Sequence, residues 1–106
     1  VVDNSMINKG TQIMGKVKSS VLFYGVKVAQ GAVVEDSVIL PNTRISSGAE
    51  IKNSIVGRSV IVEKDAKVGI EIDEENQDND ELKITVIGDD EVIPEASNIK
   101  AGMVVG

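Results

Sequence analysis

Aliphatic residues recur along this chain at steps of five or six positions. A residue that is usually smaller stands two positions before each of them, on the same side of an extended strand. In a helix, a six-residue step would rotate the side chain by about 240° and scatter the apolar positions around the axis. The pattern therefore predicts short β-strands. The series contains Leu22, Val28, Val34, Ile39, Ile45, Ile51, Val56, Val62 and Val68, after a shorter first unit with Ile7, Ile13 and Val17.

The same pattern repeats as a longer unit. The tetrads NSMI (4–7), SSVL (19–22), DSVI (36–39) and NSIV (53–56) follow one another at spacings of 15, 17 and 17 residues. Three strands per unit predict an all-β fold, a left-handed parallel β-helix of about five coils built from hexapeptide repeats. Stacked coils would align like residues on each wall. The expected small columns are Ser5, Ser20, Ser37 and Ser54; Thr11, Val26, Thr43 and Val60; and Gly15, Ala32, Ala49 and Ala66.

The repeating pattern of aliphatic residues is interrupted once. We expect regular coils over 1–69, an acidic loop over 70–83, and a final coil with a terminal strand over 84–106, in which Ile87, Ile93 and Ile99 restore the six-residue step. Glu91 breaks the inward pattern, because it stands two positions before Ile93. Either the last coil is open to solvent there, or its register shifts by one residue.

The distribution of charged and apolar residues limits the partners and the cellular location that we expect for this chain. Seven of the 17 acidic residues fall between Glu71 and Glu81, which leaves 10 acids against 11 bases elsewhere. The repeat body is therefore balanced, and we expect no nucleic-acid partner. No apolar run reaches the length of a membrane span, and no signal peptide opens the chain, so we expect a cytoplasmic protein. The start at Val1, without Met, suggests a segment of a longer polypeptide.

Few residues offer catalytic chemistry. The chain has neither Cys nor His, which removes thiolate chemistry, the usual general base and the commonest metal ligand. The serine column lacks an accompanying base, so we interpret it as small inward packing with hydrogen-bonded hydroxyls. The acids Asp36, Asp65, Asp89 and Asp90 are interpreted as solvated turn residues, and we predict no catalytic residue, cofactor site or metal site.

Two segments carry a family resemblance. The first, SSVLFYGV followed by GAVVEDSVILP (19–26 and 31–41), and the second, ITVIGDDEVIP (84–94), resemble the C-terminal domain of glucose-1-phosphate adenylyltransferase. In that family the enzyme joins ATP and glucose 1-phosphate, releases pyrophosphate and makes ADP-glucose for glycogen or starch. The resemblance implies Mg²⁺ and ATP for the parent enzyme, a tetramer, and allosteric control by sugar phosphates or related metabolites.

The resemblance also assigns partners and an effector site. It implies that a nucleotidyltransferase domain precedes this segment, that the β-helix packs on it and on other subunits, and that it contributes to the effector site. Lys64, in VEKDAKVG (62–69), matches a lysine that contacts the activator in plant forms, and Lys67 lies in the same segment. A second such lysine would fall at Gly88, and this departure favours a bacterial pattern of control.

Two further cations are candidates from spacing. Lys27 and Arg44 are 17 residues apart, so they should lie one above the other on neighbouring coils. They either gather an anion or point apart into water. Two other functions stay open: a hexapeptide acyltransferase, whose usual form is weakened by the lack of His, and a scaffold or inactive regulatory paralogue of the adenylyltransferase.

Overall fold

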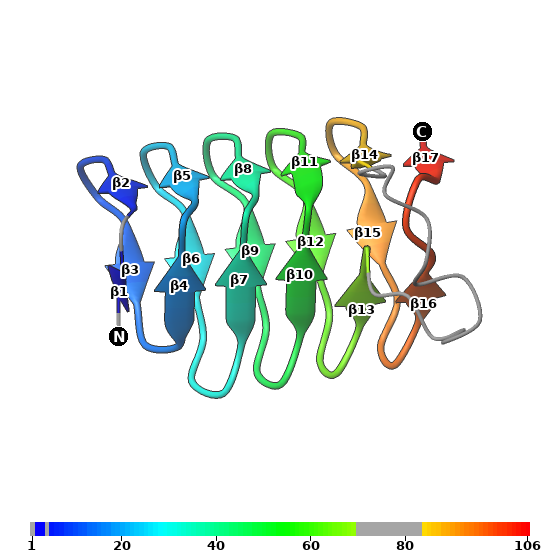
Figure 1. The fold of residues 1–106 in the computed structure, drawn as a ribbon, viewed down its shortest axis with the longest axis horizontal. Helices are drawn as coiled ribbons and strands as arrows, with labels where there is room; N and C mark the ends of the chain where they lie inside the picture. The colour runs from blue at the N-terminus through cyan, green and yellow to red at the C-terminus, as the bar shows by residue number, and fades with distance from the viewer. Residues whose placement is uncertain (1, 4, 70–83) are drawn as a thin grey trace.

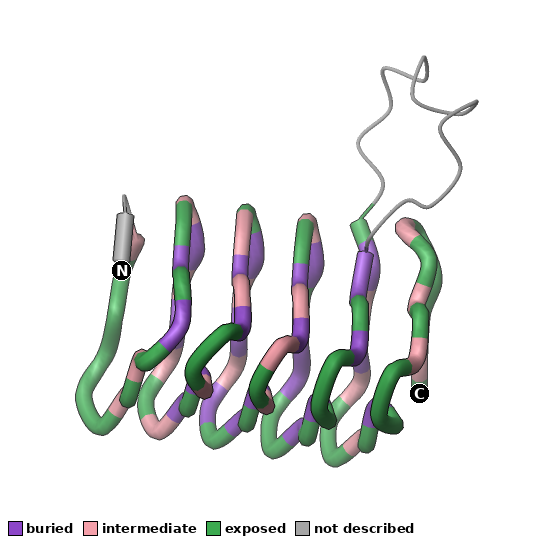
Figure 2. Tube along the Cα trace, turned by 90° about the horizontal axis from the view of Figure 1, so that it is seen from below, coloured by how far each residue is buried: buried purple, intermediate pink, exposed green. Residues whose placement is uncertain are grey.

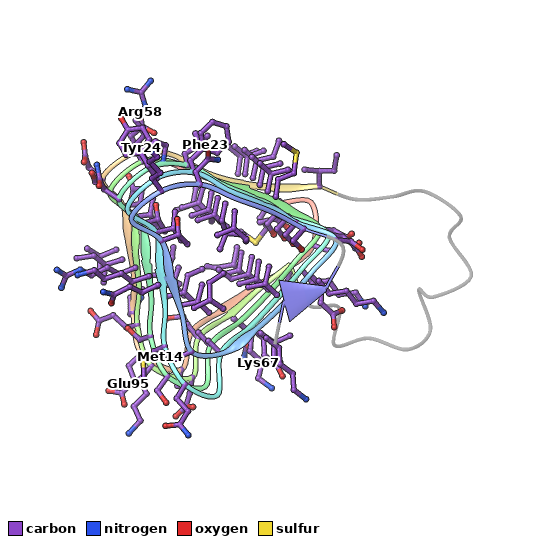
Figure 3. All side chains as sticks on the ribbon, turned by 90° about the vertical axis from the view of Figure 1, so that its left-hand side faces the viewer. Met14, Phe23, Tyr24, Arg58, Lys67 and Glu95 are labelled. Carbon is purple, nitrogen blue, oxygen red and sulfur yellow. The ribbon has the colours of Figure 1, made fainter. Side chains whose placement is uncertain are left out.

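The computed structural model describes residues 2–3, 5–69 and 84–106, and over these ranges it is a left-handed parallel β-helix, as predicted (Figure 1). The strands are two or three residues long and form three parallel sheets, which enclose a triangular prism (Figure 3). We name the sheets A, B and C. Each of the first five coils contributes one strand to each sheet, and the last described coil contributes one to sheet A and one to sheet B.

The three sheets are stacked in chain order. Sheet A contains β1 (Val2–Asp3), β4 (Lys16–Lys18), β7 (Val33–Glu35), β10 (Glu50–Lys52), β13 (Lys67–Val68) and β16 (Asn98–Ile99). Sheet B contains β2 (Met6–Ile7), β5 (Val21–Leu22), β8 (Val38–Ile39), β11 (Ser54–Val56), β14 (Thr85–Ile87) and β17 (Val104–Val105). Sheet C contains β3 (Gln12–Ile13), β6 (Lys27–Val28), β9 (Arg44–Ile45), β12 (Ile61–Val62) and β15 (Val92–Ile93).

The register of the coils confirms the predicted spacings. Val2 pairs with Val17, 15 residues on, and Val17 pairs with Val34, 17 residues on. Between β11 and β14 the step is 31 residues, 14 more than the regular unit, and the same columns then resume. The predicted acidic loop over 70–83 lies outside the described residues.

Inward-facing aliphatic side chains fill the prism. They are buried in every middle coil (Figure 2), whereas Ile7 in the first coil is 38% exposed. Burial of each such side chain contributes roughly 1.5–3 kcal/mol, so the stacked ladder is the main stabilising feature. Its large members are Val17, Leu22, Val28, Val34, Ile39, Ile45, Ile51, Val56, Val62, Val68, Ile87 and Ile93.

The turns share a left-handed backbone. Gly25, Asn42 and Ser59 occupy one corner column with φ of 72°, 65° and 53°. Asp36, Asp65 and Asp90 also have positive φ, at 49°, 59° and 61°. Asn, Asp and Gly tolerate this region better than other residues. Three of the acids interpreted as turn residues therefore have a conformational role.

The serine column is a hydrogen-bonded wall, as predicted. The Ser20 hydroxyl donates to the Lys18 carbonyl at 2.9 Å and accepts from the Ser37 N–H at 3.1 Å. The Ser37 hydroxyl repeats this arrangement with the Ser54 N–H at 3.2 Å. Thr85 pairs in register with Ser54 and continues the column into the last coil. The hydroxyls satisfy backbone groups at a sheet corner that would otherwise be buried without partners.

The structure also decides between the two alternatives at Glu91. Val92 and Ile93 pair with Ile61 and Val62, so the register is unchanged. Glu91 is half-buried, and β15 is the last described strand of sheet C. The carboxylate is tolerated there because Glu91 keeps part of its surface exposed to solvent.

Candidate functional site

A shallow groove crosses the outer face of sheet C. Its volume is about 290 Å³, and it is lined by the outward side chains of three successive coils together with the strand residues between them. Gln12, Lys27 and Arg44 form one outward column, because they are direct register partners on β3, β6 and β9. The predicted juxtaposition of Lys27 and Arg44 is therefore present.

Both groove cations are exposed and in register with each other. Among the described residues, the one ion pair within 4.0 Å joins Lys67 to Glu50, at 3.6 Å, on sheet A. No acidic side chain lines the groove itself. Lys27 and Arg44 therefore face solvent as adjacent positive charges.

The four predicted effector residues do not form one cluster. Lys64 is exposed in the turn between β12 and β13, at the corner where sheets C and A meet. Lys67 lies on the outer face of sheet A (Figure 3), where Glu50 pairs with it. The structure thus brings Lys27 and Arg44 together and places Lys64 and Lys67 at a corner and on another face.

The outer face of sheet B is an aliphatic column, which the sequence analysis did not identify. Ile55 on this face is 39% exposed, and the end members Met6 and Val104 are 69% and 70% exposed. The signal was present in the sequence, because an apolar residue stands immediately before each inward residue of this wall. We name this surface the sheet B face. Its members are Met6, Val21, Val38, Ile55, Val86 and Val104, in continuous register.

Several hydroxyl and carboxylate groups of the described residues bond to backbone groups of the fold. Buried Thr43 donates to the Gly57 carbonyl at 2.6 Å and accepts from the Val60 N–H at 3.3 Å. Asp89 accepts the Arg58 backbone N–H at 2.8 Å. Over the described ranges, no three acidic groups are close enough together to hold a metal ion. Within the same residues, no helix has the length and apolar character needed to cross a membrane.

Residues 1–88 match a family model described as GlmU-like, C-terminal hexapeptide. Proteins named glucose-1-phosphate adenylyltransferase are also similar. The one from Pseudothermotoga lettingae is 50% identical over 97% of this chain and 25% of its own length, and that from Acetivibrio thermocellus is 34% identical over 98% and 25%. A third, from Clostridium beijerinckii, is 58% identical over 65% of this chain and 18% of its own length.

The chain spans about a quarter of the length of the first two relatives, corresponding to their C-terminal domain. A crystal structure of a candidate acetyltransferase from Desulfovibrio desulfuricans superimposes with a TM-score of 0.54. It is 18% identical and covers 95% of this chain and 24% of the other. At this identity the likeness supports the fold alone.

Proposed function

Because the chain belongs to the GlmU-like C-terminal hexapeptide family, we propose that it is the non-catalytic C-terminal domain of a glucose-1-phosphate adenylyltransferase. In this proposal it supports the assembly and regulation of a cytoplasmic, oligomeric enzyme that makes ADP-glucose for glycogen biosynthesis. The observation that carries the proposal is the end-to-end similarity to one quarter of these enzymes. In this chain the matching segment forms a prism in which buried hydroxyls donate hydrogen bonds to backbone carbonyls.

The chemistry is proposed to lie on the domain that precedes this one. The described acidic residues form no cluster of three that suits Mg²⁺, which prefers several oxygen ligands and phosphate oxygens. In this proposal, Mg²⁺ and ATP bind to the catalytic domain of the parent enzyme. This chain contributes binding surfaces instead.

The sheet B face is the proposed docking surface for the catalytic domain. Six aliphatic side chains in continuous register present apolar surface along the whole prism. Exposed apolar surface of this continuity marks an interaction site. The occupant we assign is the catalytic part of the same enzyme, because the relatives have about three times as much chain outside the matched quarter.

The regulatory part of the proposal concerns Lys64. It lies at an exposed corner, where a side chain can reach a ligand held partly by a neighbouring domain. An anionic effector bound there would favour one arrangement of catalytic domain and β-helix over another. Lys67 is a weaker candidate because Glu50 already pairs with it.

A domain exchange tests the function. The C-terminal quarter of the Pseudothermotoga lettingae relative would be replaced by this chain, and pyrophosphate release from ATP and glucose 1-phosphate would be measured. We expect the chimera to form an oligomer. We also expect it to release pyrophosphate at a rate within about tenfold of the relative, because the exchanged β-helix should keep part of the native contacts with the catalytic part. A folded chimera that releases no pyrophosphate would contradict the proposal.

A further inference from the structure

The groove on sheet C is lined by several hydrogen-bond donors and by no acidic side chain, and exposed Glu63 stands outside it, one coil beyond Ser46. Its outward column runs Gln12, Lys27, Arg44, from an amide through an ammonium to a guanidinium, in direct register. Neighbouring parallel strands lie about 4.8 Å apart, so the bases of these side chains are spaced closely along the prism axis. The flanking outward column contains Met14, Ala29 and Ser46, of which the last two are small and half-buried.

The positive charges of Lys27 and Arg44 repel each other, because the two residues are direct register partners. Directly opposite cations destabilise a sheet, and no acidic residue lines this groove to offset them. On sheet A, by contrast, the charge of Lys67 is compensated, because its register partner is the acidic residue Glu50. A bound anion between Lys27 and Arg44 would remove the repulsion that the fold leaves in place.

The donor set selects the chemistry of the anion. A guanidinium presents two parallel N–H donors, an ammonium acts as a point charge, and a carboxamide adds a neutral N–H. Together they match a tetrahedral group with three terminal oxygens better than a planar carboxylate with two. The volume of about 290 Å³ lies at the lower end of small-molecule sites, which suits a small metabolite.

We infer that Gln12, Lys27 and Arg44 form a binding site for the phosphoryl group of a small metabolite on the outer face of sheet C. The site is separate from the corner that carries Lys64. It deepens the proposed regulatory role and rests on that proposal for its biological meaning. Phosphate binding to this chain can be measured without any catalytic domain, so failure of the site and failure of the proposed function are distinguishable.

The test is a titration of the ¹⁵N-labelled chain with inorganic phosphate at constant ionic strength. We expect saturable shifts of the amides of Lys27, Ala29, Arg44 and Ser46. Arg44→Gln and Lys27→Gln should each weaken binding by about tenfold, because each removes a charge-assisted contact. Arg58→Gln is the matched control: Arg58 is an exposed arginine outside the groove, and its loss should change affinity by less than about twofold.

Three results would overturn the inference. One is the lack of saturable shifts in the unmodified chain. Another is an equal loss of affinity in Arg58→Gln and Arg44→Gln, which would indicate diffuse attraction to any cation. The third is binding of acetate as tight as that of phosphate, which would remove the phosphoryl assignment. Backbone spectra of each variant verify that the coils remain folded.

Discussion

The hydroxyl of Thr43 shows how single residues maintain the prism. This side chain is fully buried, and its column neighbours one coil away on either side are Val26 and Val60, which are also buried. Valine has nearly the same shape as threonine, so volume does not explain the difference. Instead, the hydroxyl donates to the Gly57 carbonyl and accepts from the Val60 N–H at a buried corner.

Thr43→Val should therefore lower the free energy of unfolding by about 1–3 kcal/mol, because it leaves buried polar groups without a partner. Thr11→Val provides the control: Thr11 is half-buried in the first coil and makes one such bond, to the Phe23 carbonyl at 3.0 Å. Urea unfolding of the two variants measures the difference. Equal stability of Thr43→Val and the unmodified chain would disprove the hydroxyl's role.

Lys64 is the residue on which the regulatory proposal depends. In the chimera with the Pseudothermotoga lettingae catalytic part, Lys64→Ala should raise the effector concentration for half-maximal response by about tenfold, since one charged contact is lost. Basal turnover should stay unchanged, because the side chain is exposed. Arg58→Ala is the control. An unaltered effector response in the Lys64 variant would remove this residue from the site.

At the scale of elements, the backbone conformation of the turn residues affects stability. Ala96 has a φ of 58° in the same corner column as Gly31, Gly48 and Asp65. Alanine in the left-handed region costs roughly 1–2 kcal/mol, partly offset by its smaller loss of backbone entropy on folding compared with glycine.

Ala96→Gly should therefore stabilise the protein by up to about 1 kcal/mol. The same substitution at Ala66, which is fully buried and has no positive φ, should destabilise it by about 1–2 kcal/mol through lost packing and added backbone entropy. Thermal unfolding distinguishes the two. The explanation would be wrong if both variants lost stability to the same extent.

The coils should contribute unequally along the axis, because each contacts only its neighbours. Ile39 and Ile7 occupy the same column, but Ile39 is fully buried whereas Ile7 is 38% exposed. Ile39→Ala should cost about 2–5 kcal/mol and Ile7→Ala about 1 kcal/mol or less. Denaturant midpoints provide the measurement, and equal losses would contradict a ladder that weakens toward its end.

Strand, register and core could be predicted from the sequence because a repeat encodes each contact several times. The position of Lys27 above Arg44 followed from spacing alone. The ion pair of Lys67 with Glu50 was missed because it joins two coils through long flexible side chains. The sheet B face was missed because its residues precede the inward ones, and adjacent apolar residues do not show which one points outward.

At the scale of the whole molecule, three faces have three characters. Sheet B presents the aliphatic column, sheet C the cationic groove, and sheet A mixed charges that include the Lys67–Glu50 pair. The proposed function depends most on contact between the sheet B face and the catalytic part of the enzyme.

The most direct test compares Ile55→Asp with Ile61→Asp in the chimera. These isoleucines are 39% and 41% exposed, on sheets B and C respectively, so the substitutions are matched in chemistry and exposure. The two variants would be compared by sedimentation and by pyrophosphate release. We expect Ile55→Asp to lose the oligomer and most activity and Ile61→Asp to retain both. Equal behaviour of the two variants would contradict the proposed contact of the sheet B face with the catalytic part.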